Sequence, residues 1–131
     1  MADTDSVLRW VDGYEDRWRD LDAPRLVELF TSDVEYLPEP YAEPVVGLPA
    51  LEAFWVAESE PGEVFAMSRE VVCVSGRTAV VRAEVRYGNP VEAEYLDLWV
   101  LTFAPDGRVA RFEEWPFWPP HGRVPEDRQP A

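Results

Sequence analysis

A single aspartate on a strongly aromatic segment is the residue best suited to acid–base chemistry in this sequence. Asp97 follows Tyr95 by two residues and precedes Trp99 by two, in a run whose alternation is typical of a β-strand. Residues two apart on a strand share one face, so the carboxyl group of Asp97 would lie between two aromatic rings. Burial there raises the pKa of a carboxyl group toward that of a useful general acid or base. The alternative is a structural aspartate paired with Arg82 or Arg86.

Three further charged residues could assist such a group. Arg82 and Glu84 are two apart on another predicted strand, and Glu114 lies on the last one. This set resembles the site of epoxide hydrolases similar to limonene epoxide hydrolase, which implies an arginine between two buried carboxylates that holds them at different proton affinities. The same alternation also arises on a half-exposed antiparallel strand whose charges pair across the sheet. The candidate catalytic residues are therefore Asp97, Glu84, Glu114 and Arg82, with this structural alternative open.

The helices that must position these residues follow from apolar spacing and capping signals. Apolar residues three or four apart predict a long amphipathic helix opened by Asp5 or Ser6, and they are Val7, Val11, Tyr14, Trp18 and Leu21. Asp22 followed by Pro24 predicts a second, short helix. Residues 48–59 predict a third.

The remainder of the chain has the signals of strands and turns. A short strand is expected at 34–37, followed by an irregular loop at 38–44 that contains three prolines. Beyond residue 63 the apolar period becomes two and predicts four strands, at 64–74, 78–87, 93–103 and 108–118. We expect one domain over residues 1–118 and a flexible C-terminal tail over 119–131.

This order of elements resembles that of the nuclear transport factor 2-like superfamily and its SnoaL-like domains. Residues 29–36 (LFTSDVEY) resemble the start of that family's first strand, 47–55 (GLPALEAFW) its third helix, and 106–112 (DGRVARF) the hairpin before its last strand. The resemblance covers about residues 7–118. It implies an α+β, cone-shaped (cystatin-like) fold in which three N-terminal helices pack on a curved antiparallel sheet and enclose a cavity.

The resemblance leaves the chemistry open, because the fold serves isomerases, cyclases, epoxide hydrolases, dehydratases and binding modules. Ketosteroid isomerase pairs a carboxylate base with a tyrosine and a protonated aspartate. Tyr14 matches that tyrosine, but the base position falls near Pro38, with Glu39 one residue away, and the acid position falls at Trp99. Steroid isomerisation is therefore disfavoured.

The epoxide hydrolases similar to limonene epoxide hydrolase offer a second comparison. They use an arginine with a carboxylate two residues later and another carboxylate on the last strand, which Arg82, Glu84 and Glu114 resemble. Glutamate stands here in place of the family's aspartates, and the longer side chain could displace the acid by about an ångström.

Our leading hypothesis is a pocket protein for a small, largely apolar molecule, with cofactor-independent isomerase, cyclase or hydrolase chemistry as an open possibility. The alternatives are a non-catalytic ligand-binding module and a protein-interaction module. A catalytic site requires at least two polar groups that converge in the cavity. A module that only binds a ligand requires an apolar lining. A protein-interaction module would have a filled cavity and an exposed apolar patch. The candidate ligand-binding residues are Tyr14, Trp18, Tyr36, Tyr41, Trp55, Tyr95, Trp99 and Phe112.

The composition of the chain disfavours several classes of binding partner and cofactor. The net charge of -14, with twelve arginines and no lysine, argues against nucleic acids and membrane surfaces. The sequence contains no phosphate-binding glycine loop and only one histidine, His121, so we expect no cofactor and no metal. The lone Cys73 is expected to be a small buried side chain. No secretion signal or membrane-length apolar run is found, which predicts a cytoplasmic protein.

Residues 93–103 are apolar on both faces of their predicted strand. Such a strand must be covered on both sides. The helices would cover one side and a second subunit the other, so we expect a homodimer.

Overall fold

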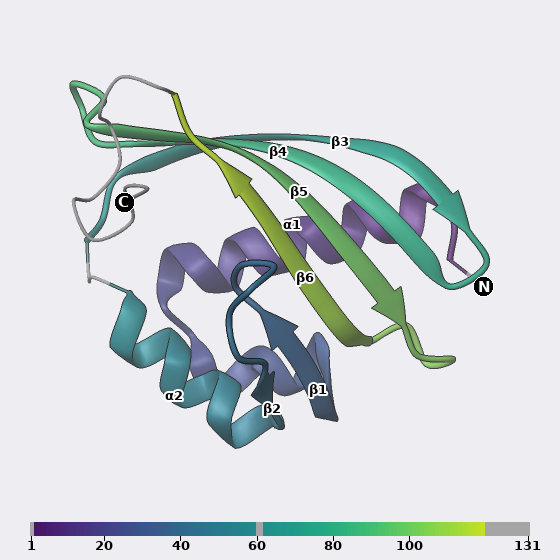
Figure 1. Ribbon diagram of the computed structural model, residues 1–131. Helices are drawn as coiled ribbons and strands as arrows, with labels where there is room; N and C mark the ends of the chain where they lie inside the picture. The colour runs from purple at the N-terminus through teal and green to yellow at the C-terminus, as the bar shows by residue number, and fades with distance from the viewer. Residues whose placement is uncertain (1, 60–61, 120–131) are drawn as a thin grey trace.

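Two helices and a 3₁₀ turn lie against a curved six-stranded sheet in the computed structural model, which describes residues 2–59 and 62–119 (Figure 1). The helical elements are α1 (Thr4–Asp20), η1 (Ala23–Glu28) and α2 (Leu48–Glu58). The strands are β1 (Phe30–Leu37), β2 (Val45–Val46), β3 (Phe65–Ser75), β4 (Thr78–Tyr87), β5 (Ala93–Phe103) and β6 (Val109–Phe117). This α+β arrangement agrees with the prediction.

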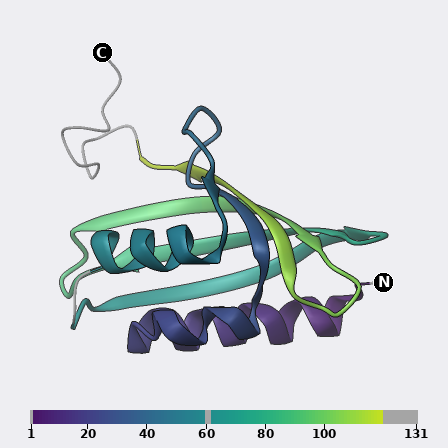
Figure 2. The same ribbon diagram turned by 90° about the horizontal axis from the view of Figure 1, so that it is seen from below.

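The sheet has the strand order β2-β1-β6-β5-β4-β3. The long strands β3 to β6 form the predicted antiparallel meander, and β1 joins it by pairing in parallel with β6. The sheet is therefore mixed. Figures 1 and 2 show that it bends over α1 and that α2 lies on the same, concave side. This bend leaves room for a cavity between the helices and the sheet.

The apolar stripe of α1 forms the centre of the core. Val7 and Val11 are fully buried, and the rings of Trp10 and Tyr14 stack with their centroids 5.3 Å apart. The indole Nε1 of Trp10 donates a 2.9 Å hydrogen bond to the backbone oxygen of Leu29, just before β1. This contact fixes the first helix against the start of the sheet.

Four local predictions differ from the structure. The first strand begins at Phe30 rather than at residue 34. Helix α1 begins at Thr4 because Asp3, rather than Asp5 or Ser6, is its N-cap, and Asp3 and Ser6 form a reciprocal capping box. The second predicted helix is a 3₁₀ turn. Cys73 is exposed rather than buried, because it lies after a register shift in β3 with its side chain away from the helix layer.

Two further predictions concern the C-terminal tail and the absence of a membrane-spanning segment. Residues 120–131 of the expected tail, His121 included, lie outside the described residues. Over residues 2–59 and 62–119, no helix is both long and apolar enough to span a lipid bilayer.

Candidate functional site

A cavity of about 450 Å³ lies between the two helices and the concave face of the sheet. Nine of the 21 described residues that line it are aromatic, and they come from both helices and from strands β1, β3, β4 and β5. Six of the eight predicted ligand-binding residues line it: Tyr14, Trp18, Tyr36, Trp55, Tyr95 and Trp99. Their rings make edge and tilted contacts, for example between Trp18 and Trp55, so the wall of the cavity is a continuous aromatic surface.

The other two predicted ligand-binding residues do not line the cavity. Tyr41 is fully exposed on the loop between β1 and β2, in the segment whose prolines prevent regular pairing. Phe112 is completely buried behind the lining, with its ring centroid 5.4 Å from those of Tyr14, Tyr36 and Trp99. Phe112 therefore supports the aromatic wall from within the core.

Asp97 has its carboxyl group in this aromatic cavity, and only 9% of its surface is exposed. The residues opposite it on the neighbouring strands are Ala83 on β4 and Pro116 on β6, and neither side chain can hydrogen-bond to it. Its Oδ1 atom has no hydrogen-bond partner among the described residues. The pKa of Asp97 is raised to about 6 because burial disfavours its charged form. The neighbouring indole of Trp99 has the opposite, smaller effect on this pKa.

Trp99 is another buried polar group without a hydrogen-bond partner among the described residues. Its side chain is 2% exposed, and its Nε1 atom has no hydrogen-bond partner of acceptable geometry within the described part of the chain. The indole N–H therefore lies near the Asp97 carboxyl group without a well-formed hydrogen bond to it. A donor and an acceptor are thus both available at the wall of the cavity.

Glu114 and Tyr36 form a third polar element of the cavity. The Tyr36 hydroxyl donates a 2.5 Å hydrogen bond to Oε2 of Glu114, which joins β1 to β6 across their parallel pairing. Burial and the Glu114 carboxylate raise the pKa of Tyr36 well above its ordinary value, so its hydroxyl stays protonated. Because Glu114 lies opposite Trp99, it is a diagonal cross-strand neighbour of Asp97. Such residues are roughly 7 Å apart along the sheet, measured between their backbone positions.

Arg82 and Glu84 lie on the opposite, convex face of the sheet. Arg82 forms an ion pair with Glu70, and Glu84 forms one with Arg86 at 3.3 Å. Their cross-strand neighbours on β5 are Leu98 and Leu96, which also point away from the helices. The structure therefore does not bring Arg82 and Glu84 together with Glu114, and it pairs Asp97 with neither Arg82 nor Arg86.

The mouth of the cavity carries carboxylates that were not among the candidate site residues of the sequence. They are Glu39 after β1, Glu58 at the end of α2, Glu63 before β3 and Glu92 in the turn between β4 and β5. They line one cavity because three connections, β1–β2, α2–β3 and β4–β5, lie at the same side of it. No sequence pattern relates residues that far apart.

Glu15 on α1 also lines the cavity but is held by two arginines. Arg19 binds it with an N–O distance of 2.7 Å, and Arg69 from β3 forms a second ion pair with it. The Arg19 guanidinium lies over the ring of Phe65, 4.1 Å from its centroid. The charge of Glu15 is therefore compensated, unlike that of Asp97.

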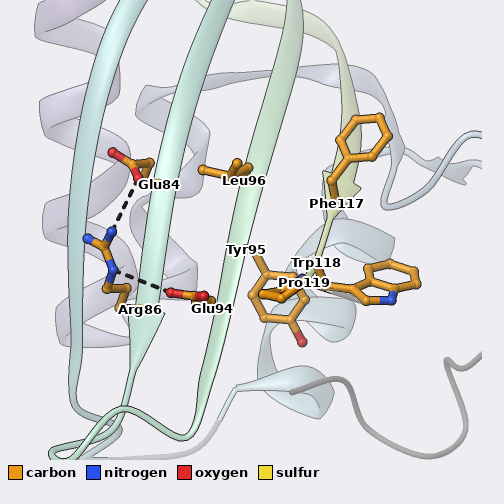
Figure 3. A pocket seen from close by; sticks show the side chains of 8 residues that line it. All are labelled: Glu84, Arg86, Glu94, Tyr95, Leu96, Phe117, Trp118 and Pro119. Carbon is orange, nitrogen blue, oxygen red and sulfur yellow. Dashed lines mark hydrogen bonds and ion pairs between the residues drawn. The ribbon is translucent and has the colours of Figure 1, made fainter. Parts of the chain in front are cut away.

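A smaller hollow of about 200 Å³ lies on the convex side near the ends of β5 and β6 (Figure 3). Figure 3 shows Arg86 with dashed contacts to Glu84 and Glu94 on one side of the hollow, and Phe117 on the other side, with Leu96 between them. The charged groups here are already paired with each other, at 3.3 and 3.6 Å. This hollow offers apolar contact area rather than a reactive group.

Comparison with known families agrees with this architecture. The SnoaL-like domain model matches residues 7–112. The chain belongs to the SnoaL-like domain family. No curated protein matches the sequence.

Solved structures similar to this SnoaL-like chain have several named chemistries. A protein from Sinorhizobium meliloti, provisionally named a polyketide cyclase, shares 27% identity with a TM-score of 0.64, over 81% of this chain and 93% of that one. A Kribbella flavida protein, provisionally named a ketosteroid isomerase, shares 22% with a TM-score of 0.66, over 100% and 95%. An epoxide hydrolase from Mycobacterium tuberculosis, similar to limonene epoxide hydrolase, shares 12% with a TM-score of 0.64, over 87% and 84%. The predicted family and fold are confirmed, and these names do not choose one reaction.

Proposed function

We propose that this SnoaL-like chain binds a small, largely apolar molecule in its aromatic cavity and catalyses a cofactor-independent proton transfer on it, with Asp97 as the proton-transferring group. The observation that carries the proposal is the buried carboxyl group of Asp97, which has an oxygen atom without a partner among the described residues, in a cavity large enough for a ligand. A carboxyl group with a pKa of about 6 can both accept and return a proton near neutral pH.

The reaction class that fits is isomerisation or cyclisation through an enol or enolate. Asp97 would remove a proton from a carbon next to a carbonyl group and return it to another carbon. The carbonyl oxygen gains negative charge in that step and needs a hydrogen-bond donor. The indole N–H of Trp99, which has no partner among the described residues, is the donor nearest to Asp97 along the strand.

The three hypotheses drawn from the sequence require different cavities. Asp97, Trp99 and Glu114 supply polar groups within one cavity, as the catalytic hypothesis requires. An epoxide hydrolase-like mechanism has less support, because Arg82 and Glu84 are paired on the convex face. The non-catalytic binding module is the alternative to be tested.

The test measures hydrogen–deuterium exchange at the α-carbon of enolisable aromatic ketones and polyketide-like aromatics, followed by NMR in D₂O. Wild type is compared with Asp97→Asn, and Glu84→Gln on the convex face is the matched control. We expect Asp97→Asn to lower the exchange rate at least about 100-fold, because a positioned general base contributes that much. Glu84→Gln should leave the rate unchanged.

Two outcomes would count against this function. An exchange rate that Asp97→Asn leaves intact removes Asp97 from the mechanism. Binding of these compounds without exchange in wild type, at any pH from 5 to 8, supports the non-catalytic binding module instead.

A further inference from the structure

The charged side chains that line the cavity are all acidic. Seven described residues of the lining carry carboxyl groups, namely Glu15, Glu39, Glu58, Glu63, Glu92, Asp97 and Glu114, and Arg19 and Arg69 form ion pairs with Glu15. Among the described residues that line it, none is an arginine, and the chain contains no lysine. Charges of one sign around a cleft with low-dielectric walls focus the field into it, so this cavity attracts cations and repels anions.

The interior of the cavity also suits a cation. Aromatic faces attract ammonium groups, and this attraction becomes stronger as water is excluded. The rings of Tyr14, Trp18 and Trp55 form one side of the cavity, and Tyr87, Tyr95 and Trp99 form part of the sheet side. The cavity therefore combines apolar contact area with a preference for positive charge.

The buried carboxyl group of Asp97 gives this preference a definite position. The residue is more than nine-tenths buried, and its Oδ1 atom has no donor among the described residues. A protonated amine would supply the missing N–H donor and neutralise the charge, and such charge-assisted hydrogen bonds are roughly twice as strong as neutral ones. An anion at the same place would instead be repelled by the carboxylate of Asp97, and more weakly by that of Glu114 farther along the sheet.

We propose that the ligand of this cavity is a protonated amine attached to an apolar, ring-containing body, with the ammonium group on Asp97 and the rings against the aromatic wall. This inference names the ligand class of the site in the proposed function and rests on that site. It concerns binding alone: an ammonium group on Asp97 would occupy the carboxylate that the proposed function uses as a base, so the amine is a ligand of the site and not the substrate of the proton transfer.

Three probes with the same ring system separate charge from shape. They are 2-(2-naphthyl)ethylamine, which is protonated at pH 7.5, the neutral 2-(2-naphthyl)ethanol, and the anion 2-naphthylacetate. Isothermal titration calorimetry at pH 7.5 on the full chain gives the affinity of each. We expect the amine to bind at least about tenfold more tightly than the alcohol, and the acetate most weakly.

Variants then locate the selectivity. Asp97→Asn should lower the affinity for the amine about tenfold and leave that for the alcohol nearly unchanged, since only the amine interacts with the charge. Glu114→Gln is a second variant of the same kind and keeps the test valid if Asp97→Asn does not fold. Glu84→Gln, on the convex face, is the matched control and should change neither affinity.

The proposal is overturned if the alcohol binds as tightly as the amine, if the acetate binds most tightly, or if the amine does not bind. It is also overturned if neither Asp97→Asn nor Glu114→Gln reduces the preference for the amine. The proposed function fails separately, through the ketone exchange assay. Selective amine binding without hydrogen–deuterium exchange would support this inference and contradict the proposed catalytic function. Exchange without selective amine binding would support the catalytic function and contradict this inference.

Discussion

Asp97 differs from the other acidic residues of the sheet because its neighbours cannot compensate its charge. Glu84 and Glu70 have arginine partners on the convex face, where water also screens them. Asp97 lies opposite Ala83 and Pro116, with aromatic rings beyond them. An ionised carboxylate in such surroundings lowers the stability of the fold. Destabilising groups of this kind are found most often at functional sites.

This cost gives a prediction for pH-dependent stability. The pKa of Asp97 is about 6 in the folded chain and 3.8 in the reference state, so the folded state binds more protons between these values. Ionised Asp97 therefore destabilises the fold progressively as the pH rises from about 4 to 6, by about 3 kcal/mol in total. Asp97→Asn should remove this loss and be more stable than wild type at pH 7, with the difference vanishing below pH 4.

Urea denaturation of both proteins at several pH values measures this difference. Taking the difference cancels the titration of the other carboxylates, which is common to the two proteins. A difference that stays constant from pH 4 to pH 7 would show that Asp97 has an ordinary pKa in the folded state.

At the scale of elements, the sequence predicted most of what positions the site. The period of two on β5 placed Asp97 on the same face as Tyr95 and Trp99, and the structure agrees. The period of two on β4 indicated equally that Arg82 and Glu84 face away from its apolar residues. Only the family resemblance placed these two in the candidate site, and a match of residue types does not say which face of a strand is buried.

The mouth of the cavity was beyond sequence reasoning, for a physical reason. Three of its four carboxylates lie in connections whose shapes depend on turn geometry, the fourth, Glu58, ends α2, and the proximity of all four depends on the bend of the sheet. Neither quantity has a periodic signature. The parallel pairing of β1 with β6 could not be predicted from the sequence either, because it joins residues about 75 positions apart, such as Tyr36 and Phe112.

The turn after β4 gives a prediction at this scale. Gly88 has φ +92°, and a Cβ atom there would lie 2.9 Å from the backbone oxygen of Pro90. The same turn leads to Glu92 and Ala93 at the mouth of the cavity. Gly88→Ala should therefore lower the free energy of unfolding by about 1–3 kcal/mol and disturb ligand affinity as well.

Gly107 provides a matched control for this substitution. Its φ is +90°, but a Cβ atom there would have no described neighbour within 4 Å, so Gly107→Ala tests backbone strain without the close contact. Chemical denaturation of both variants should show the larger loss for Gly88→Ala. Equal losses would mean that the turn relaxes away from the contact.

At the scale of the molecule, the convex face of the sheet has more exposed apolar surface than a monomer requires. Leu96, Trp115 and Phe117 are 55%, 42% and 55% exposed, and they lie on the adjacent strands β5 and β6. Leu98 is opposite Trp115, and Leu96 is opposite Phe117, so these side chains form one patch. A contiguous exposed apolar patch of this kind is typical of an interaction surface.

We propose that a second copy of the chain covers this patch, as the two apolar faces of β5 led us to expect. A two-fold interface would place the patch against itself, because an isologous contact uses the same surface on both subunits. Analytical ultracentrifugation should then give twice the 15.0 kDa mass of one chain. Leu96→Arg, within the patch, should shift the mass to that of the monomer, because each subunit would then have to bury an added charge in the interface.

Val56→Arg is the control for this experiment, since Val56 is 72% exposed on α2 and lies outside the patch. It adds the same charge elsewhere and should leave the dimer intact. Because the cavity opens on the concave side, the Leu96→Arg monomer should still bind a cavity ligand. A wild-type chain that sediments as a monomer at micromolar concentrations would contradict the dimer and leave the convex patch to a different partner.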